Sequence, residues 1–111
     1  MRSPTYFLDL DGVIFKHQGG GSKWYGLMSL CPRVRETLDR LETLGACIII
    51  VTARKESARR ITERQLEALA VPYDQLIMGI TAGTRILVND KESFVLNLNR
   101  NEGIERCLEL Y

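Results

Sequence analysis

The sequence lacks a strong charge of either sign and has no long hydrophobic run. Its 111 residues carry 15 basic and 14 acidic side chains, which gives a formal net charge of +1. A near-neutral chain has no field that attracts nucleic acid or an anionic membrane, so we expect neither as a partner. The longest apolar runs, 46–51 and 86–88, are far too short to cross a bilayer, and we therefore expect a soluble cytoplasmic protein.

The sequence is also poor in residues that bind soft metals. Its three cysteines show no paired metal-ligand spacing, and its single histidine, His17, has no matching cysteine or second histidine. We interpret the cysteines as free structural thiols and His17 as a surface residue. What remains is a chain of one-domain length with 45% hydrophobic residues, which predicts a single domain over residues 1–111.

Short apolar segments predict four strands. The β-prone run 5–10 ends abruptly in acids and a glycine, and 46–51 is almost continuously apolar, as in a strand covered on both faces of a parallel sheet. Segments 75–78 and 85–88 have the composition of two further strands.

Helical spacing appears between these strands. Apolar residues recur from Val34 to Leu44, with Pro32 suited to the first turn and Gly45 to the position after the end. A second helix is expected over 56–70, with its mixed charges on a solvated face, and a terminal helix over 104–110.

The order of strands and helices predicts an α/β fold, a three-layer Rossmann-like arrangement with a parallel sheet, right-handed crossovers and helices on both faces. Between the first strand and the first helix, the cluster Gly19–Gly21 indicates the turn of a small flap. Trp24 and Tyr25 in this flap either line a substrate entrance or anchor the flap on the core.

Polar residues follow three of the predicted strands. In open parallel sheets, sites form outside the carboxyl ends of the strands, so Asp9, Asp11, Thr52 and Asp90 should converge. One residue separates the first two acids, so their side chains point the same way if the strand continues. Three carboxylates make an oxygen-rich site that suits Mg²⁺, which would also offset the charge of a bound phosphate.

Three segments resemble motifs of the haloacid dehalogenase (HAD) superfamily. Tyr6–Val13 is similar to its first motif, Ile49–Arg54 to its second and Ile86–Lys91 to its fourth, in the family's order and strand context. The resemblance covers Thr5 to Lys91. Neither interval where the family inserts a cap domain is long enough here, so the resemblance implies a capless form.

The resemblance implies a role for each matching residue. Asp9 would be the nucleophile that forms an aspartyl-phosphate, and Asp11 the general acid and base. Phosphate would be bound at the second motif by Thr52, Ala53 and Arg54. The Mg²⁺ ligands would be the Asp9 carboxylate, the Asp11 backbone carbonyl and Asp90, completed by water and phosphate.

The sequence departs from the family pattern at two places. Asn89 stands where the fourth motif usually has an acid, and segment 78–85 lacks the lysine of the third motif. Three other cations are candidates to reach the site: Lys55, Arg85 and Lys91.

We therefore predict a Mg²⁺-dependent phosphomonoester hydrolase that acts on a small phosphorylated metabolite such as a sugar phosphate, with a homo-oligomer as one way to cover its open site. A descendant that binds phosphate without turnover is the main alternative, because the lysine is missing. A response-regulator-like receiver is disfavoured, because its phosphoacceptor would have to lie on a middle strand of the sheet. A phosphatase that acts on the ends of nucleic acids is disfavoured by the near-neutral charge of the chain. In the plainest interpretation, Asp11-Gly12 is only a turn and Thr52 only a helix cap.

Overall fold

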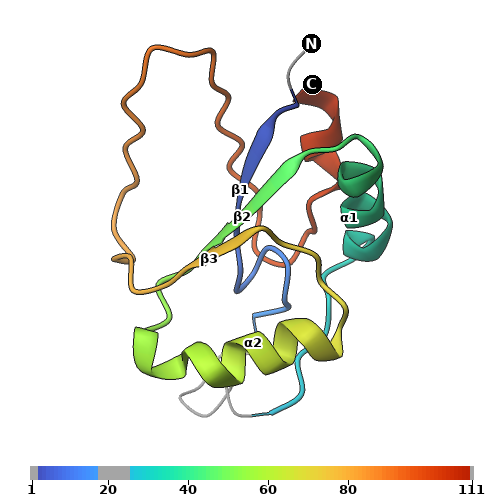
Figure 1. The fold of residues 1–111 in the computed structure, drawn as a ribbon, viewed down its shortest axis with the longest axis vertical. Helices are drawn as coiled ribbons and strands as arrows, with labels where there is room; N and C mark the ends of the chain where they lie inside the picture. Colours follow the sequence, from blue (N-terminus) through green and yellow to red (C-terminus); the bar gives the residue numbers. More distant parts are fainter. Residues whose placement is uncertain (1–2, 18–25, 111) are drawn as a thin grey trace.

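The computed structural model describes residues 3–17 and 26–110. Within these two ranges, three parallel strands, two α-helices and two 3₁₀ segments follow one another (Figure 1). In chain order they are β1 (Thr5–Asp9), α1 (Val34–Thr43), β2 (Cys47–Val51), η2 (Glu56–Ala58), α2 (Arg59–Ala68), β3 (Gln75–Ile77) and η3 (Glu105–Leu110).

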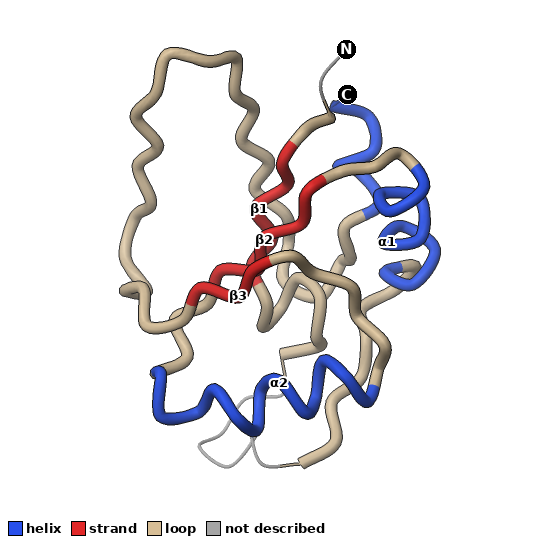
Figure 2. The backbone as a smooth tube through the Cα atoms, viewed as in Figure 1, coloured by secondary structure: helices blue, strands red, loops and turns tan. Residues whose placement is uncertain are grey.

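The strands form one sheet in the order β1-β2-β3, with both pairs parallel. Helix α1 connects β1 to β2, and α2 connects β2 to β3 (Figure 2). The register aligns Asp9 with Val51 and Val51 with Ile77, so the carboxyl ends of the strands lie together. The prediction of an α/β fold with a parallel sheet is confirmed.

One face of the sheet is buried. Leu8, Ile50 and Leu76 are neighbours across the three strands, and they pack in one core with Leu38 of α1 and Leu66 of α2. This burial follows from the alternation of side chains along each strand and from the apolar stripe of each helix.

The opposite face is open in part. Phe7 of β1 is 57% exposed and Ile77 of β3 is 39% exposed, although both are large apolar residues. The prediction that the sheet is covered on both faces is therefore wrong at these positions. A run of apolar residues shows that a strand can be buried, but not whether another element covers it.

Both predicted helices are formed, with small differences at their ends. Helix α2 covers 59–68 of the predicted 56–70, and residues 56–58 form the 3₁₀ segment η2 instead. After α1, Gly45 adopts φ 74° and donates its N–H to the carbonyl of Glu42, while the N–H of Ala46 donates to the carbonyl of Leu41. These two bonds form a Schellman cap, in which glycine tolerates the left-handed conformation. Ala70 takes the same conformation after α2, with φ 51°.

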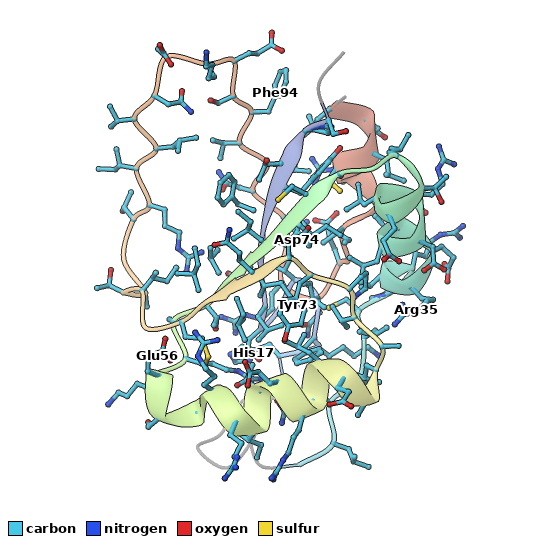
Figure 3. All side chains as sticks on the ribbon, in the orientation of Figure 1. His17, Arg35, Glu56, Tyr73, Asp74 and Phe94 are labelled. Atoms are coloured by element: carbon cyan, nitrogen blue, oxygen red, sulfur yellow. The ribbon has the colours of Figure 1, made fainter. Side chains whose placement is uncertain are left out.

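The fourth predicted strand, over 85–88, is not formed. After β3 the chain extends away from the sheet in a long loop, residues 80–98, which we call the arm (Figures 2 and 3). Val88 is 87% exposed, and the arm returns to the core through the partly buried Leu96 and Leu98. A strand requires a neighbour for its backbone N–H and C=O groups, and segment 85–88 pairs with no strand of the described chain.

The end of the chain closes the core beside α1. The terminal helix predicted over 104–110 is the 3₁₀ segment η3, and it buries Cys107. Gly103 precedes it with φ 93° and packs so closely on Pro32 that a Cβ atom there would lie 2.2 Å from the Pro32 carbonyl oxygen. Within the described ranges, no helix has both the length and the apolar character needed to cross a membrane.

The predicted flap is described at its base only. The N–H of Lys16 donates to the carbonyl of Ser29, and the N–H of Cys31 donates to the carbonyl of Ile14, so two short segments run antiparallel. Gly19–Gly21, Trp24 and Tyr25 lie outside the described residues, and their roles remain predictions.

Candidate functional site

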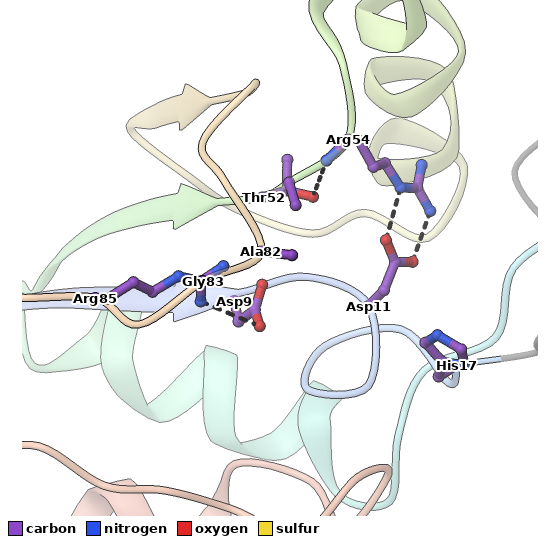
Figure 4. A pocket seen from close by; sticks show the side chains of 9 residues that line it. Asp9, Asp11, His17, Thr52, Arg54, Ala82, Gly83 and Arg85 are labelled. Carbon is purple, nitrogen blue, oxygen red and sulfur yellow. Dashed lines mark hydrogen bonds and ion pairs between the residues drawn. The ribbon is translucent and has the colours of Figure 1, made fainter.

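A cavity of about 460 Å³ opens at the carboxyl ends of the strands. Figure 4 shows the residues that line it, which come from the end of β1 and the turn after it, the base of the flap, the loop after β2 and the start of the arm. They are Asp9, Asp11, His17, Thr52, Ala53, Arg54, Ala82, Gly83 and Arg85. The site therefore lies where the strand order predicts it.

Asp9 is the last residue of β1 and faces the cavity with a partly accessible carboxylate. Its Oδ1 accepts a hydrogen bond from the N–H of Leu10 at 2.9 Å. Its Oδ2 lies 3.4 Å from Nη1 of Arg85, and both side chains are partly exposed. Arg85 thus places a cation beside Asp9, although in the sequence it is only one of three candidate cations.

A tight turn directs Asp11 into the same cavity. Gly12 adopts φ 87° and donates its N–H to the carbonyl of Phe15 at 2.7 Å, while its own carbonyl accepts the N–H of Asn101 at 2.8 Å. A Cβ atom on Gly12 would lie 3.3 Å from the Arg100 side chain, so the C-terminal segment packs directly on the turn. The glycine after the two acids is required by this conformation.

Arg54 forms a two-pronged ion pair with Asp11. Its Nε donates to Asp11 Oδ2 at 2.9 Å and its Nη2 donates to Asp11 Oδ1 at 2.8 Å. The planar guanidinium matches the two carboxylate oxygens, which fixes both the position and the plane of the carboxylate. The sequence predicts Arg54 as a phosphate contact, whereas in the structure this edge of the guanidinium faces Asp11.

The rest of the Arg54 side chain is buried against polar and aromatic groups. Nη1 donates to Thr62 Oγ1 at 2.9 Å and to Gln65 Oε1 at 2.7 Å, both on α2. The guanidinium carbon also lies 5.7 Å from the centre of the Phe15 ring, within the range of a cation–π contact. Sequence reasoning did not identify Thr62 or Gln65, although with Leu66 and Leu69 they share the helical spacing of a buried stripe.

Thr52 and Ala53 form the wall of the cavity after β2. Thr52 is buried, and its Oγ1 accepts the N–H of Arg54 at 3.1 Å, a bond that shapes the turn. Because this oxygen acts as the acceptor, the hydroxyl hydrogen can donate to a ligand oxygen in the cavity. The backbone after the turn is anchored to β3, since Gly79 N–H donates to the carbonyl of Arg54 at 2.7 Å.

His17 also lines the cavity, which the sequence analysis did not predict. It lies at the end of the described part of the flap base, where its N–H donates to Asn101 Oδ1 at 2.7 Å. The chain reaches His17 only six residues after Asp11, which is the signal that could have indicated its place beside the acids. A residue that lines an open cavity can still be a surface residue, so that interpretation of His17 remains a prediction.

The three residues predicted from the fourth motif are not brought to the cavity. Asn89, Asp90 and Lys91 lie on the arm and are exposed, and Asn89 contacts Ser93 within the arm itself. In the described ranges, no three acids, histidines or cysteines come close enough to hold a metal ion. The arrangement therefore does not fit the expected Mg²⁺ site, which needs Asp90 as its third acid, and no step below is derived through a metal.

The thiols lie away from this chemistry. Burial raises the pKa of the Cys107 thiol to about 11, and burial likewise raises the pKa of Cys31 above its ordinary value, an effect that Lys16 partly opposes. Both groups are therefore protonated at neutral pH and suited to packing. All three cysteines are free, as predicted.

Comparison with known proteins supports the fold and leaves the family open. No family model matches the chain, and no curated protein matches it. Among solved structures, it is similar to a chain of the Pnkp1/Rnl/Hen1 complex, with a TM-score of 0.62 and 26% identity. This match covers 75% of the present chain and 30% of the other.

Two further structures give the same result. The crystal structure of a target protein from Vibrio cholerae matches with a TM-score of 0.58 and 24% identity. This match covers 74% of the present chain and 77% of the other. A chain of the Pnkp1/Rnl/Hen1 RNA repair complex has a TM-score of 0.60 and 24% identity, over 75% and 28%. The protein thus spans less than a third of the chains that it matches in these complexes, but most of the Vibrio cholerae target.

Proposed function

We propose that the protein is a phosphomonoester hydrolase of the HAD type, with Asp9 as the nucleophile and Asp11 as the general acid and base. The observation that carries the proposal is the convergence of both acids with Thr52 and a cation, Arg85, in one cavity at the carboxyl end of a parallel sheet. The resemblance of segments 6–13 and 49–54 to HAD motifs falls on the residues that line this cavity.

The arrangement supports a reaction in two steps. In the first, an Asp9 oxygen attacks phosphorus, the ester bond breaks, and Asp11, in its protonated form, gives its proton to the departing alcohol oxygen. The ion pair with Arg54 is the state that Asp11 reaches after this transfer. In the second, Asp11 takes a proton from a water molecule that attacks the aspartyl-phosphate, which releases phosphate and restores Asp9. Atoms and protons balance, since one water is consumed and one alcohol is formed.

Arg85 would take the part that a lysine has in the family pattern. An incoming phosphate must approach the negatively charged Asp9, and a cation that contacts both groups lowers this repulsion. The separation of 3.4 Å between Arg85 Nη1 and Asp9 Oδ2 supports this role. The missing lysine therefore does not by itself favour the binding-only alternative.

Magnesium remains a prediction of the sequence. A site with Asp90 as its third acid requires the arm to fold back until Asp90 reaches Asp9, because Asp90 is exposed on the arm in this structure. The direct measurement is phosphate release with Mg²⁺ and with a chelator, for the wild type and Asp90→Asn. A Mg²⁺ requirement that Asp90→Asn weakens would establish the ligand, and equal activity with the chelator would remove metal from the proposal.

Two classes of substrate fit the open cavity. A small phosphorylated metabolite such as a sugar phosphate is the one predicted from the sequence. A phosphate at the end of an RNA strand is the second candidate, suggested by the structural similarity to a chain of the Pnkp1/Rnl/Hen1 RNA repair complex. The mixed charges of α2 argue against extensive binding of an RNA sugar-phosphate backbone. Arg59 is paired with Glu56 at 2.8 Å and lies 3.5 Å from Glu63.

The experiment that tests the proposal is release of inorganic phosphate from an aryl phosphate, a panel of sugar phosphates and a short RNA with a terminal phosphate. Wild type is compared with Asp9→Asn and with Asp39→Asn, a matched control on the exposed side of α1. We expect loss of at least about 10³-fold for Asp9→Asn, because covalent catalysis is abolished, and no change for the control.

Each outcome decides between the candidates. Turnover that Asp9→Asn removes supports the hydrolase, and the preferred member of the panel identifies the substrate class. No turnover of any substrate, together with phosphate-dependent stabilisation of the fold, would instead establish the binding-only alternative.

A further inference from the structure

Helix α2 buries two polar side chains in the stripe where an amphipathic helix normally places apolar ones. Thr62 is 0% exposed and Gln65 is 7% exposed, and both face Arg54. Buried polar groups are costly unless they are hydrogen-bonded, so their presence requires a reason. Here the reason lies in the geometry of Arg54.

The guanidinium acts as a rigid connector between α2 and Asp11. One nitrogen, Nη1, is held by Thr62 and Gln65, while Nε and Nη2 hold the carboxylate of Asp11. Because the group is planar and cannot bend, the position of Nη1 fixes the direction in which the other two nitrogens point. The orientation of the Asp11 carboxylate thus depends on two side chains that do not touch it.

Gln65 connects this network to the flap as well. Its amide nitrogen donates to the carbonyl of Gly26 at 3.0 Å while its oxygen accepts from Arg54. The amide therefore has partners on both sides, which fixes its own orientation and prevents it from rotating away from Arg54.

Stability alone does not explain the arrangement. The Arg54 side chain is fully buried and that of Asp11 is 17% exposed, and a buried ion pair of this kind is often no more stabilising than apolar side chains of similar volume. What the ion pair and its two supports provide, and apolar packing would not, is a defined direction for one carboxylate that lines the cavity.

We propose that Thr62 and Gln65 are positioning residues that hold Asp11, through Arg54, in the orientation needed to protonate the leaving oxygen. The inference rests on the proposed function, in which Asp11 is the general acid. It assigns a catalytic purpose to a helix whose sequence otherwise indicates only a core stripe and a charged surface.

The nature of the leaving group separates this role from a structural one. An alkyl phosphate expels a poor leaving group that needs a proton, whereas a dinitrophenyl phosphate expels a stable phenolate that does not. Misdirecting Asp11 should therefore lower kcat/KM for the alkyl ester by about 10-fold or more, and for the dinitrophenyl ester by less than about 2-fold. The ratio kcat/KM is used because it reports the step in which the leaving group departs.

The variants are chosen to keep shape and change hydrogen bonding. Thr62→Val and Gln65→Met remove the acceptors for Arg54 with little change in volume, and Thr62→Ser keeps the hydroxyl and should restore the activity on the alkyl ester. Thr43→Val is the matched control, since its hydroxyl donates to the Asp39 carbonyl on α1, away from the cavity. Circular dichroism and thermal unfolding of each variant show that the protein is folded at the assay temperature.

Four outcomes are distinguishable. A selective loss on the alkyl ester, restored by Thr62→Ser, supports the inference. Equal losses on both esters would show a purely structural role, and unchanged rates would show that the two residues are dispensable, so either result overturns it. A wild type that hydrolyses neither ester refutes the proposed function itself, and the positioning role with it.

Discussion

The Arg54–Asp11 ion pair gives the most demanding test of the structure. Removing Arg54 should lower the stability of the protein, and a second substitution that removes the charge of Asp11 should restore part of it. Arg54→Met keeps the length of the buried side chain but removes all the donors to Asp11, Thr62 and Gln65. Asp11 then retains a charge without a partner, and the oxygens on α2 lose their hydrogen bonds.

The size of the effect follows from burial. Breaking a buried ion pair by removing one partner typically costs 3–5 kcal/mol, most of it from the charge left behind. Asp11 lines the cavity and is 17% exposed, so water can partly hydrate it. The lower end of the range of 3–5 kcal/mol therefore applies, and we expect Arg54→Met to lower the free energy of unfolding by about 3 kcal/mol.

The double variant Asp11→Asn/Arg54→Met identifies the origin of this loss. Neutralising Asp11 removes the stranded charge, so the double variant should be more stable than Arg54→Met alone by about 1–2 kcal/mol. Urea unfolding followed by circular dichroism at neutral pH measures all four proteins of the cycle. A loss below about 1 kcal/mol for Arg54→Met, or a double variant less stable than it, would refute the reasoning.

Three other predictions concern the scaffold. Ala70→Gly should stabilise the protein by about 0.5–1 kcal/mol because φ is 51° there, whereas Ala68→Gly, at the last residue of α2, should destabilise it by less than about 1 kcal/mol; thermal unfolding of the pair decides. Gly103→Ala should cost more than about 2 kcal/mol in the same assay, since its Cβ would lie 2.2 Å from a carbonyl oxygen. At pH 8 an aromatic disulfide reagent should modify Cys107 only after unfolding, because burial raises its pKa to about 11, while the half-buried Cys47 reacts in the native protein. The stability contributed by the protonated Cys107 is fully present below the pKa of an unfolded cysteine and is lost as the pH rises towards 11.

Local signals in the sequence predicted most of the scaffold. The strands around 5–9 and 47–51 and the two α-helices were identified from apolar periodicity and stop signals such as Gly45, which depend on neighbouring residues only. The convergence of Asp9, Asp11 and Thr52 could also be predicted, because the carboxyl ends of parallel strands meet at one edge.

The features that were missed depend on residues far apart in the sequence. Segment 85–88 has the composition of a strand, but a strand forms only where another backbone is available to pair, and composition does not contain that information. In the same way, Thr62 and Gln65 resemble ordinary polar helix residues until Arg54, eight and eleven positions earlier, is placed beside them.

The two acids of the site differ in how the fold holds them, and this difference supports their different roles. Asp11 is fixed from behind by a buried guanidinium that is itself anchored to α2, whereas Asp9 meets the partly exposed Arg85 at the open side of the cavity. A general acid must keep one direction through both steps, while a nucleophile must be reachable and must exchange its contact for a bond to phosphorus. In the proposed mechanism, the rigid support therefore belongs to the residue that only transfers a proton, and the accessible carboxylate, 37% exposed, to the one that attacks.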